Sequence, residues 1–243
     1  MSAKRGVAVL VGAGDAIGAA VARRFSQGGM AVCIARRDAA KSQALVDELT
    51  KEGHSVHAFS VDARQEADVQ AFFAKVEAEI GPIEVCLYNA GSNVNKPLLE
   101  TTGKLFFKAW ELACYGGFLV GREAAKYMLE RGHGTMLFTG ATASLRGSAG
   151  FAGFAGAKAG LRMLAQSLAR ELGPRGIHVA HVVIDGGIAT EFIRENHPER
   201  YALKDQDGIL APDHVAESYW MLHMQPRDAW THEMDLRPWM EKF

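Results

Sequence analysis

The amino-acid sequence predicts an α/β fold, with one doubly wound parallel sheet and helices on both faces. Three observations predict it. Apolar runs of strand length alternate with stretches of helix length along the chain. The first run, residues 7–11, is wholly apolar, which is typical of a strand buried on both faces. No repeat, low-complexity tract or linker interrupts the alternation, so we expect a single domain over residues 1–243.

The expected elements follow in regular order and make about seven strands. After residues 7–11, we expect strands at 30–35, 55–61, 83–88, 135–139, 178–184 and 233–236. We expect helices at 19–25, 39–51, 66–80, 102–130, 153–172 and 215–224. Gly81 and Pro82 end the third of these helices, and two glycines, Gly116 and Gly117, lie inside the fourth.

Composition and charge exclude several classes of protein. Lys and Arg number 27 against 28 Asp and Glu, so no strong field favours nucleic acid or an anionic membrane. No apolar run reaches the roughly 18 residues of a membrane span. The first strand begins so close to Met1 that no room is left for a signal peptide.

The cysteines and histidines predict neither disulfides nor a metal site. Cys33, Cys86 and Cys114 lie far apart with no CxxC spacing, and we expect three reduced core thiols in a cytoplasmic protein. His178 and His181 are three apart in an expected strand, so they point to opposite faces and cannot share a metal ion.

A glycine-rich turn follows the first strand. Gly12 and Gly14 let the backbone come close to a ligand, and Gly18 lets the next helix pack tightly on the strand. The free N–H groups at the start of that helix then face an anion, most naturally a pyrophosphate. The alternative is a tight turn between strand and helix that binds nothing.

Two arginines, Arg36 and Arg37, follow the second strand, where such a sheet meets the ribose of an adenosine. An acidic residue there would bond the 2′-hydroxyl, whereas an arginine receives a 2′-phosphate. Residues 33–37 contain no Asp or Glu, so NADP(H) is favoured over NAD(H). The alternative is a pair of solvated arginines at a strand end.

Two further strand ends could touch the same cofactor. Asp62, after the third strand, either bonds the adenine amino group or caps a turn. Asn89, Ala90 and Gly91 follow the fourth strand and let the backbone approach the cofactor, although alone they would be an ordinary turn.

Together these motifs resemble the short-chain dehydrogenase/reductase family, single-domain Rossmann oxidoreductases that use NAD(H) or NADP(H). Residues 11–18 read VGAGDAIG where the family has TGxxxGIG, residues 88–91 read YNAG for NNAG, and residues 185–190 read DGGIAT for PGxIxT. The resemblance covers nearly the whole chain. Besides Arg36, Arg37 and Asp62, it implies cofactor contacts at Gly12, Gly14, Asp15, Ile17, Gly18, Asn89, Ala90, Gly91, Lys158, Gly186, Ile188 and Thr190.

The family's catalytic tetrad is Asn, Ser, Tyr and Lys, the last two as YxxxK. The matching run here is FAGAK, which puts Phe154 at the Tyr position and Lys158 at the Lys position. Ala141 stands at the Ser position, 13 residues before Phe154, and Ala113 at the Asn position of the WxxN…GxF pattern. Only Lys158 matches the tetrad. It could still bond the nicotinamide ribose, and a solvated helix lysine is the alternative.

The replaced positions bear on the chemistry. Reducing a carbonyl needs a proton donor, which in the family is the tyrosine with a pKa lowered by the lysine. Phe154 has no ionisable group. Thr142 and Asp185 are candidate substitutes, as are Ser144 and Tyr115, although a structural role is the ordinary expectation for each. Another reading is hydride transfer to a substrate that needs no enzyme proton, such as a quinone or an activated C=C bond.

The resemblance also implies a lid and an assembly. Residues 187–211 are too polar for a core and stand where the family has its substrate lid, with a disordered surface loop as the alternative. Trp230 and Trp239 predict packing on a neighbouring subunit or, equally, on their own. Small residues in helices 102–130 and 153–172 permit close helix approach between subunits, so we expect a homodimer or homotetramer.

The sequence thus predicts a cytoplasmic, NADP(H)-binding oxidoreductase. It would move hydride to or from a small carbonyl, alcohol or unsaturated substrate at a non-standard catalytic site, with neither nucleic acid nor membrane as partner. The rival hypothesis is a catalytically silent cofactor-binding protein, either a redox sensor or a partner subunit. The replaced tetrad favours the rival, whereas the nucleotide site and the lid fit both.

Overall fold

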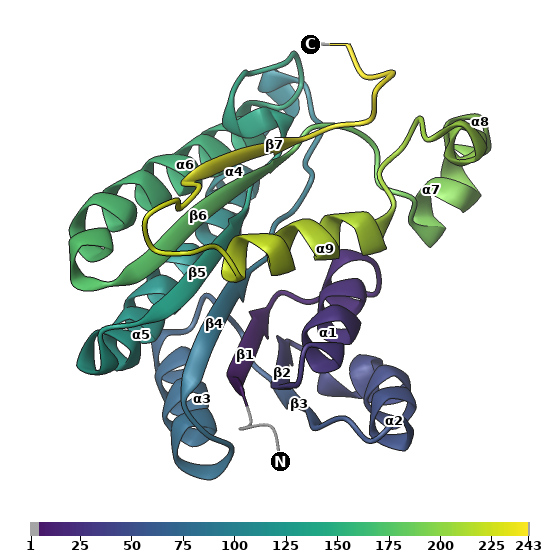
Figure 1. The fold of residues 1–243 in the computed structure, drawn as a ribbon. Coiled ribbons are helices and arrows are strands. Elements are labelled where there is room, and N and C mark those ends of the chain that lie inside the picture. Colours follow the sequence, from purple (N-terminus) through teal and green to yellow (C-terminus); the bar gives the residue numbers. More distant parts are fainter. Residues whose placement is uncertain (1–4, 243) are drawn as a thin grey trace.

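Seven parallel strands form one sheet in the computed structural model, which describes residues 5–242 (Figure 1). Their order across the sheet is β3-β2-β1-β4-β5-β6-β7, and every neighbouring pair is parallel. The strands are β1 (Arg5–Val11), β2 (Met30–Arg36), β3 (Val56–Ser60), β4 (Ile83–Tyr88), β5 (Gly134–Thr139), β6 (Ile177–Ile184) and β7 (Glu233–Leu236). The predicted doubly wound sheet is therefore confirmed. Residues 1–4, on which the expectation about a signal peptide partly depends, lie outside the described residues.

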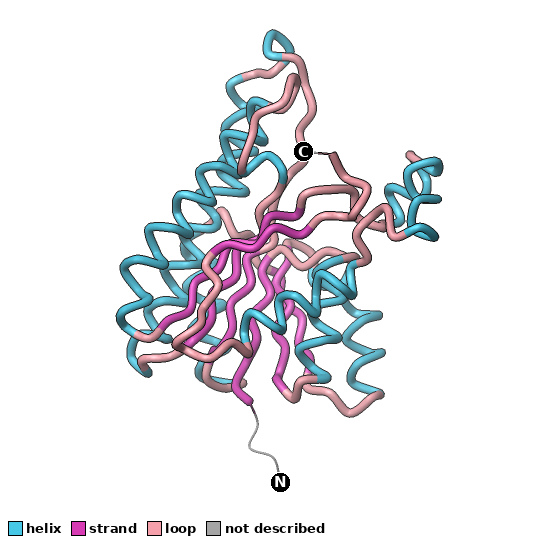
Figure 2. Tube along the Cα trace, turned by 45° about the horizontal axis from the view of Figure 1, so that its top comes forward, coloured by secondary structure: helices cyan, strands magenta, loops and turns pink. Residues whose placement is uncertain are grey.

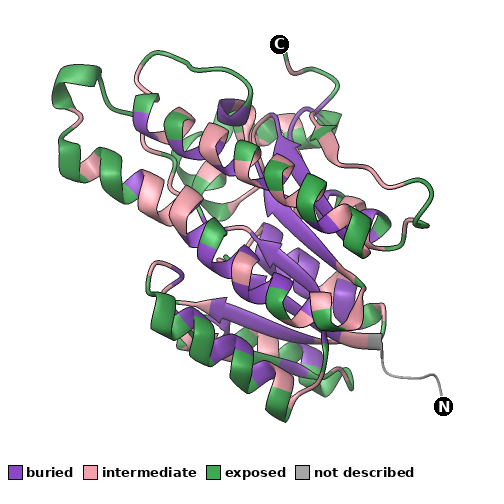
Figure 3. Cartoon of the chain, turned by 90° about the vertical axis from the view of Figure 1, so that its left-hand side faces the viewer, coloured by how far each residue is buried: buried purple, intermediate pink, exposed green. Residues whose placement is uncertain are grey.

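Helices cover both faces of the sheet, so that the strands lie buried between them (Figures 2 and 3). One face is covered by α1 (Ile17–Gln27), α2 (Gln43–Lys51) and α9 (Pro212–His223). The other is covered by α3 (Glu66–Glu79), α5 (Gly116–Arg131) and α6 (Ala152–Leu172), with α4 (Gly103–Trp110) packed against α6.

The first strand shows why its sequence is apolar at every position. Val7 and Val9 of β1 pack in the cluster that includes Phe73 of α3. Ala8 and Leu10, which alternate with them, pack in the opposite cluster. Successive side chains of a strand point to opposite faces, so a strand covered on both sides has no position for a polar residue.

The order of the strands reverses beside β1, because β2 and β3 lie on one side of it and β4 to β7 on the other. In an open parallel sheet, the crevice for a ligand lies at the carboxyl ends of the strands at this point. The loops after β1, β4, β5 and β6 therefore meet at one edge.

Two expected helices are interrupted. Residues 39–51 form a 3₁₀ turn, Ala39–Ser42, before α2 begins, and the carboxylate of Asp38 accepts a hydrogen bond from the Ala40 N–H, 3.2 Å away. Residues 102–130 split into α4 and α5, joined by a π-helical turn, Glu111–Tyr115. Such a turn disturbs the regular helical hydrogen bonds, and the Tyr88 hydroxyl donates a hydrogen bond to the Leu112 carbonyl there. The π-helical turn ends directly before Gly116 and Gly117, whereas the turn at residues 39–42 has no proline or glycine signal.

The small residues expected between subunits instead pack within the chain. A side chain at Gly117 would meet Leu161, one at Gly160 would meet Cys114, and one at Gly153 would approach Phe106. Ala109, Ala113, Gly116 and Ala157 are also buried. The outer surface of α4 and α5 instead carries a row of aromatic rings with neighbouring centroids 6.1–6.3 Å apart. We call this row the aromatic ladder; its members are Phe107, Trp110, Tyr115 and Phe118.

Residues 187–211 are largely helical and stand apart from the sheet (Figure 2). They contain α7 (Glu191–Asn196), α8 (Pro198–Tyr201) and a 3₁₀ turn, Ala202–Gln206, so the alternative of a disordered loop is not what the structure shows. We call this segment the lid. The chain after β7 runs against it, and the Trp239 indole N–H donates a hydrogen bond to the Gln206 carbonyl, 3.0 Å away. Trp230 stacks on His178 of the same chain.

The cysteines are unpaired thiols, as expected, but only two are core residues. Cys33 and Cys86 are buried, and burial raises the pKa of each to about 12. Cys114 is half-buried. His178 and His181 lie on separate faces of β6, where His181 contacts Glu233 and His178 the Thr231 carbonyl. No helix in the described part of the chain combines the length and apolar character needed to cross a membrane.

Candidate active site

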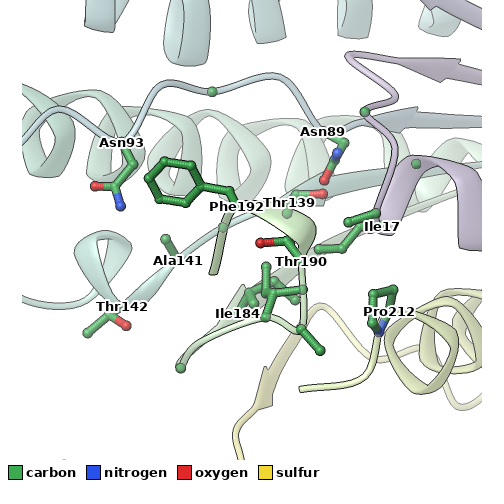
Figure 4. A pocket seen from close by; sticks show the side chains of 18 of the residues that line it. Ile17, Asn89, Asn93, Thr139, Ala141, Thr142, Ile184, Thr190, Phe192 and Pro212 are labelled. Atoms are coloured by element: carbon green, nitrogen blue, oxygen red, sulfur yellow. The ribbon is translucent and has the colours of Figure 1, made fainter. Parts of the chain in front are cut away.

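A cavity of about 1100 Å³ lies at the carboxyl ends of β1, β4, β5 and β6. Its floor is made by the loops after these strands, and the lid contributes Phe192, Arg200 and Tyr201. Figure 4 shows Asn93, Ala141, Thr142 and Phe192 around the same space. Most of the predicted site residues line it: Gly12, Gly14, Asp15, Ile17, Gly18, Asn89, Gly91, Ala141, Thr142, Phe154, Lys158, Gly186, Ile188 and Thr190.

The glycine-rich turn is built for a ligand at the start of α1. Gly12 has a φ of +78°, and a Cβ there would lie 2.5 Å from the Ala90 backbone nitrogen. A Cβ at Gly14 would meet no atom within 4 Å, because this residue opens onto the cavity. No side chain caps the N-terminus of α1. Its first N–H groups therefore remain available to an anion, which fits the pyrophosphate of a dinucleotide.

The second strand ends beside that turn. The Arg36 guanidinium donates to the Asp15 carboxylate across 2.7 Å, and both line a smaller cavity of about 210 Å³. Lys41 lines the same small cavity. Arg37 is exposed. The sequence did not single out Lys41, whose only signal was its place four residues after Arg37.

Asp62 and Ala113 lie outside the lining of both cavities described here. Asp62 accepts two hydrogen bonds from the Arg64 side chain and one, of 3.1 Å, from the Arg64 backbone N–H. The bonded Arg64 guanidinium lowers the pKa of Asp62. Asp62 thus caps the turn after β3, and its bond to an adenine stays a prediction. Ala113 is buried in the π-helical turn.

Lys158 is the charged group deepest in the main cavity. Its ammonium donates to the Thr139 carbonyl, 2.8 Å away, and burial lowers its pKa to about 8. Phe154 lies one helical turn earlier on α6 and also lines the cavity. Ala141 faces the same space from the loop after β5 (Figure 4). The wall that these three residues form has one cation and no hydroxyl group.

A hydroxyl and a carboxylate meet next to that wall. The Thr142 hydroxyl lines the cavity and donates to Asp185 Oδ1 across 2.5 Å. Asp185, at the end of β6, is only 1 % exposed. Its other oxygen lies 3.5 Å from an Arg237 nitrogen, and Oδ1 lies 4.0 Å from Arg146 Nη2. This arrangement places a carboxylate at hydrogen-bond distance from the threonine oxygen, where the two groups can exchange a proton.

The remaining candidates have structural contacts. The Ser144 hydroxyl is buried and accepts a hydrogen bond from the Ala141 N–H, 3.1 Å away. Tyr115 belongs to the aromatic ladder. Thr190 lines the cavity while its hydroxyl caps α7 by accepting from the Ile193 N–H, 3.2 Å away.

The sequence is similar to known proteins along most of its length. Residues 6–200 match the family of short chain dehydrogenases. This chain belongs to that family. A short-chain dehydrogenase/reductase from the fungus Hericium erinaceus, eriH, is 33 % identical over 208 residues, which cover 83 % of this chain and 81 % of the relative.

Solved structures agree with this membership. A short-chain dehydrogenase from Rhodopseudomonas palustris is 45 % identical, with a TM-score of 0.83 over 96 % of this chain and 99 % of that one. An alcohol dehydrogenase from the archaeon Thermococcus sibiricus, complexed with 5-hydroxy-NADP, is 25 % identical. Its TM-score is 0.86, over 98 % of each chain. The short-chain dehydrogenase described here thus shares the single Rossmann-like domain of its family.

Three lining residues of this short-chain dehydrogenase carry no sequence signal. Arg146 comes from the loop after β5, Arg200 from α8, and Phe192 from α7. Each lies in a connection between strands of the sheet, two of them in the lid and one in the loop after β5. Alternation of strands and helices places the loops at the cavity but does not say which of their side chains point into it.

Proposed function

We propose that this short-chain dehydrogenase binds NADP(H) in preference to NAD(H). Arg36, Arg37 and Lys41 supply positive charge at the end of β2, where the adenosine ribose is expected. The glycine-rich turn would hold the pyrophosphate, and Asn89 to Gly91 with Lys158 would hold the nicotinamide half. The Thermococcus relative, which is complexed with a modified NADP, supports this choice. When bound, the nicotinamide donates or accepts the hydride.

The arginines test the preference directly. A charge-assisted hydrogen bond contributes about 1.5–3 kcal/mol, so Arg36→Ala with Arg37→Ala should weaken NADPH binding about 10- to 100-fold. NADH binding should hardly change. Asp15→Asn is the opposing variant: it frees Arg36 from its 2.7 Å ion pair and should strengthen NADPH binding. Isothermal titration calorimetry measures the affinity of the parent protein and of each variant for both cofactors. Equal affinities of the parent protein for the two cofactors would refute the assignment.

We further propose an oxidoreductase reaction on a small carbonyl, alcohol or unsaturated substrate, at a catalytic site that departs from the family's tetrad. The observation that carries the proposal is the hydrogen bond from Thr142, which lines the cavity, to the buried Asp185, which does not line it. The threonine oxygen accepts the proton of a substrate hydroxyl while its own proton passes to the carboxylate. The carbon-bound hydrogen leaves with its electron pair as the hydride, which yields the carbonyl product. Carbonyl reduction returns the same proton from Asp185.

This proton path has a direct test. Thr142→Val keeps the shape of the side chain and removes the hydroxyl, and Asp185→Asn keeps the shape and removes the base. Each should lower kcat about 10²-fold or more, the usual worth of general acid–base help, with the affinity for NADP unchanged. Ser148→Ala, which removes another hydroxyl from the cavity lining, serves as the control. Full activity in Thr142→Val would refute the path.

A catalytically silent protein remains the competing function, favoured by the apolar side chains of Phe154, Ala141 and Ala113. Stopped-flow absorbance of bound NADPH against a panel of ketones, diketones, quinones and enones separates the two. Oxidation by any member of the panel supports the enzyme. No oxidation across the panel would support a redox sensor or a partner subunit.

We also propose that the protein is a homodimer or homotetramer that assembles through the aromatic ladder. The two terminal rings, Phe107 and Phe118, are 55 % and 40 % exposed. Aromatic side chains are enriched at subunit interfaces. The small residues of the same helices are used inside the chain, so the aromatic ladder is the surface left for a second copy.

A further inference from the structure

Two guanidinium groups line the main cavity away from the glycine-rich turn. Arg146 belongs to the loop after β5 and Arg200 to α8 of the lid. Their side chains are 45 % and 48 % exposed. The nucleotide-binding role proposed above uses neither of them.

The described residues leave hydrogen-bond donors of both guanidinium groups without an acceptor. Arg146 Nη2 lies 4.0 Å from Asp185 and 3.5 Å from the Lys242 carbonyl, and Arg200 Nη2 lies 4.0 Å from Glu241. Most other arginines of the described chain are hydrogen-bonded to a carboxylate. Arg162, for example, makes two bonds of 2.6 Å to Glu233. Arg146 and Arg200 thus present several N–H donors to the cavity.

Arg146 lies close to the Thr142–Asp185 pair, and Arg200 lines the same cavity. Asp185 Oδ1, which accepts the Thr142 hydrogen bond, also lies 4.0 Å from Arg146 Nη2. Arg200 and Arg146 both approach the same short segment, residues 241–242. A substrate whose oxygen lies at Thr142 therefore has a guanidinium beside it.

The charges and the remaining wall define what fits. Arg146 and Arg200 each have one carboxylate 4.0 Å away, Asp185 and Glu241, which is beyond hydrogen-bond distance and leaves N–H donors of both guanidiniums for a ligand. The guanidinium fork matches the two oxygens of a carboxylate. Three aromatic rings also line the cavity, those of Phe151, Phe154 and Phe192.

We propose that Arg146 and Arg200 bind a carboxylate on the substrate, so that the substrate is a hydroxy or oxo acid with an apolar body. The proposal rests on the proposed function for the reacting group, but the binding of the carboxylate does not. The lid thereby takes part in substrate recognition, because Arg200 of α8 lines the cavity.

Binding to the NADPH-saturated protein tests the proposal without turnover. Phenylacetate and phenylacetamide have the same shape and differ in charge, and calorimetry measures both in the millimolar range expected for such small ligands. We expect phenylacetate to bind at least about tenfold more tightly, since a charge-assisted hydrogen bond is worth that much or more. Equal binding of the two probes, or no binding of either, would overturn the proposal.

Substitutions show which side chains bind phenylacetate. Arg146→Gln and Arg200→Gln should each remove about tenfold in phenylacetate affinity and leave phenylacetamide unchanged. Glu241→Gln, which removes the competing acid, should tighten phenylacetate binding. Arg170→Gln is the control, because Arg170 is exposed near the far end of α6, where it donates a hydrogen bond to the Gln166 carbonyl. Equal loss for both probes in the two cavity variants would show a structural effect and refute the assignment.

Failure of this proposal and failure of the proposed function are distinguishable. If phenylacetate binds as expected but no hydroxy or oxo acid is turned over, the carboxylate site stands and the catalytic proposal falls. If oxo acids and their methyl esters are reduced with equal kcat/KM, the catalytic proposal stands and the carboxylate site falls.

Discussion

Restoring a proton donor is the sharpest test of how Phe154 is placed. Phe154 lines the cavity on α6, one turn before Lys158, and Ala141 faces the same space from the opposite loop. The double variant Phe154→Tyr with Ala141→Ser adds a phenol beside the Lys158 ammonium and a hydroxyl to hold the substrate oxygen. Both additions extend into the cavity and not into the core.

The expected size of the effect follows from Lys158. Its pKa of about 8 keeps it mostly protonated at neutral pH. A cation within a few ångströms lowers the pKa of a phenol by about 1–3 units from about 10. The introduced tyrosine would then titrate near the working pH, where general acid help is worth about 10²–10⁴ in rate.

The assay is NADPH-dependent reduction of reactive diketones at pH 7. The parent protein has Phe154 and Ala141 in place of these two hydroxyl groups, so reduction should be slow. The double variant should gain about 10²-fold or more. Phe151→Tyr adds the same hydroxyl to the neighbouring ring of the cavity, 6.5 Å away between centroids, and should gain nothing. A folded, NADPH-binding double variant without any gain would refute the placement of Phe154.

Three further predictions concern assembly and stability. Phe107→Glu with Phe118→Glu should convert an oligomer seen by light scattering into a monomer, and a parent protein that is already monomeric would contradict the aromatic-ladder interface. His181 is buried, and burial lowers its pKa to about 4. Between pH 6.5 and 4 the unfolded state therefore binds more protons than the folded state. The free energy of unfolding should fall by about 3 kcal/mol as the pH drops through that window. Denaturant titrations should show a smaller fall in His181→Gln. Lys158→Met removes a buried charge and should raise stability at pH 7 by up to about 3 kcal/mol while weakening NADPH binding, and lower thermal stability would contradict this.

The fold could be predicted because its signals are local. The apolar strand at residues 7–11 and even the short strand Glu233–Leu236 lie where the sequence pattern puts them. The tight turn at Gly12 and Gly14 could also be predicted, because it joins β1 directly to α1. The π-helical turn could not be predicted, because it depends on a residue distant in the sequence. The Tyr88 hydroxyl, at the end of β4, donates a hydrogen bond to the Leu112 carbonyl within the turn.

The candidate site depends more on contacts between distant segments. Thr142 and Asp185 were both named from the sequence, but their hydrogen bond joins the ends of β5 and β6 and needs the fold to be seen. Arg36 was expected at the adenosine ribose, which stays a prediction, and its pairing with Asp15 was not expected. Arg200 reaches the cavity only through the path of the lid, which no local pattern specifies.

The bond between the lid and the last residues has a practical use. Trp239 is 75 % exposed and bonds the Gln206 carbonyl, whereas Trp220 is in the core and Trp230 is stacked on a histidine. Its indole is thus a natural optical reporter on a segment that touches the lid. Any ligand that shifts the lid should change the wavelength or the intensity of the Trp239 fluorescence emission. Subtracting the spectrum of Trp239→Phe isolates that signal. The chain needs no attached dye to show when the cavity closes.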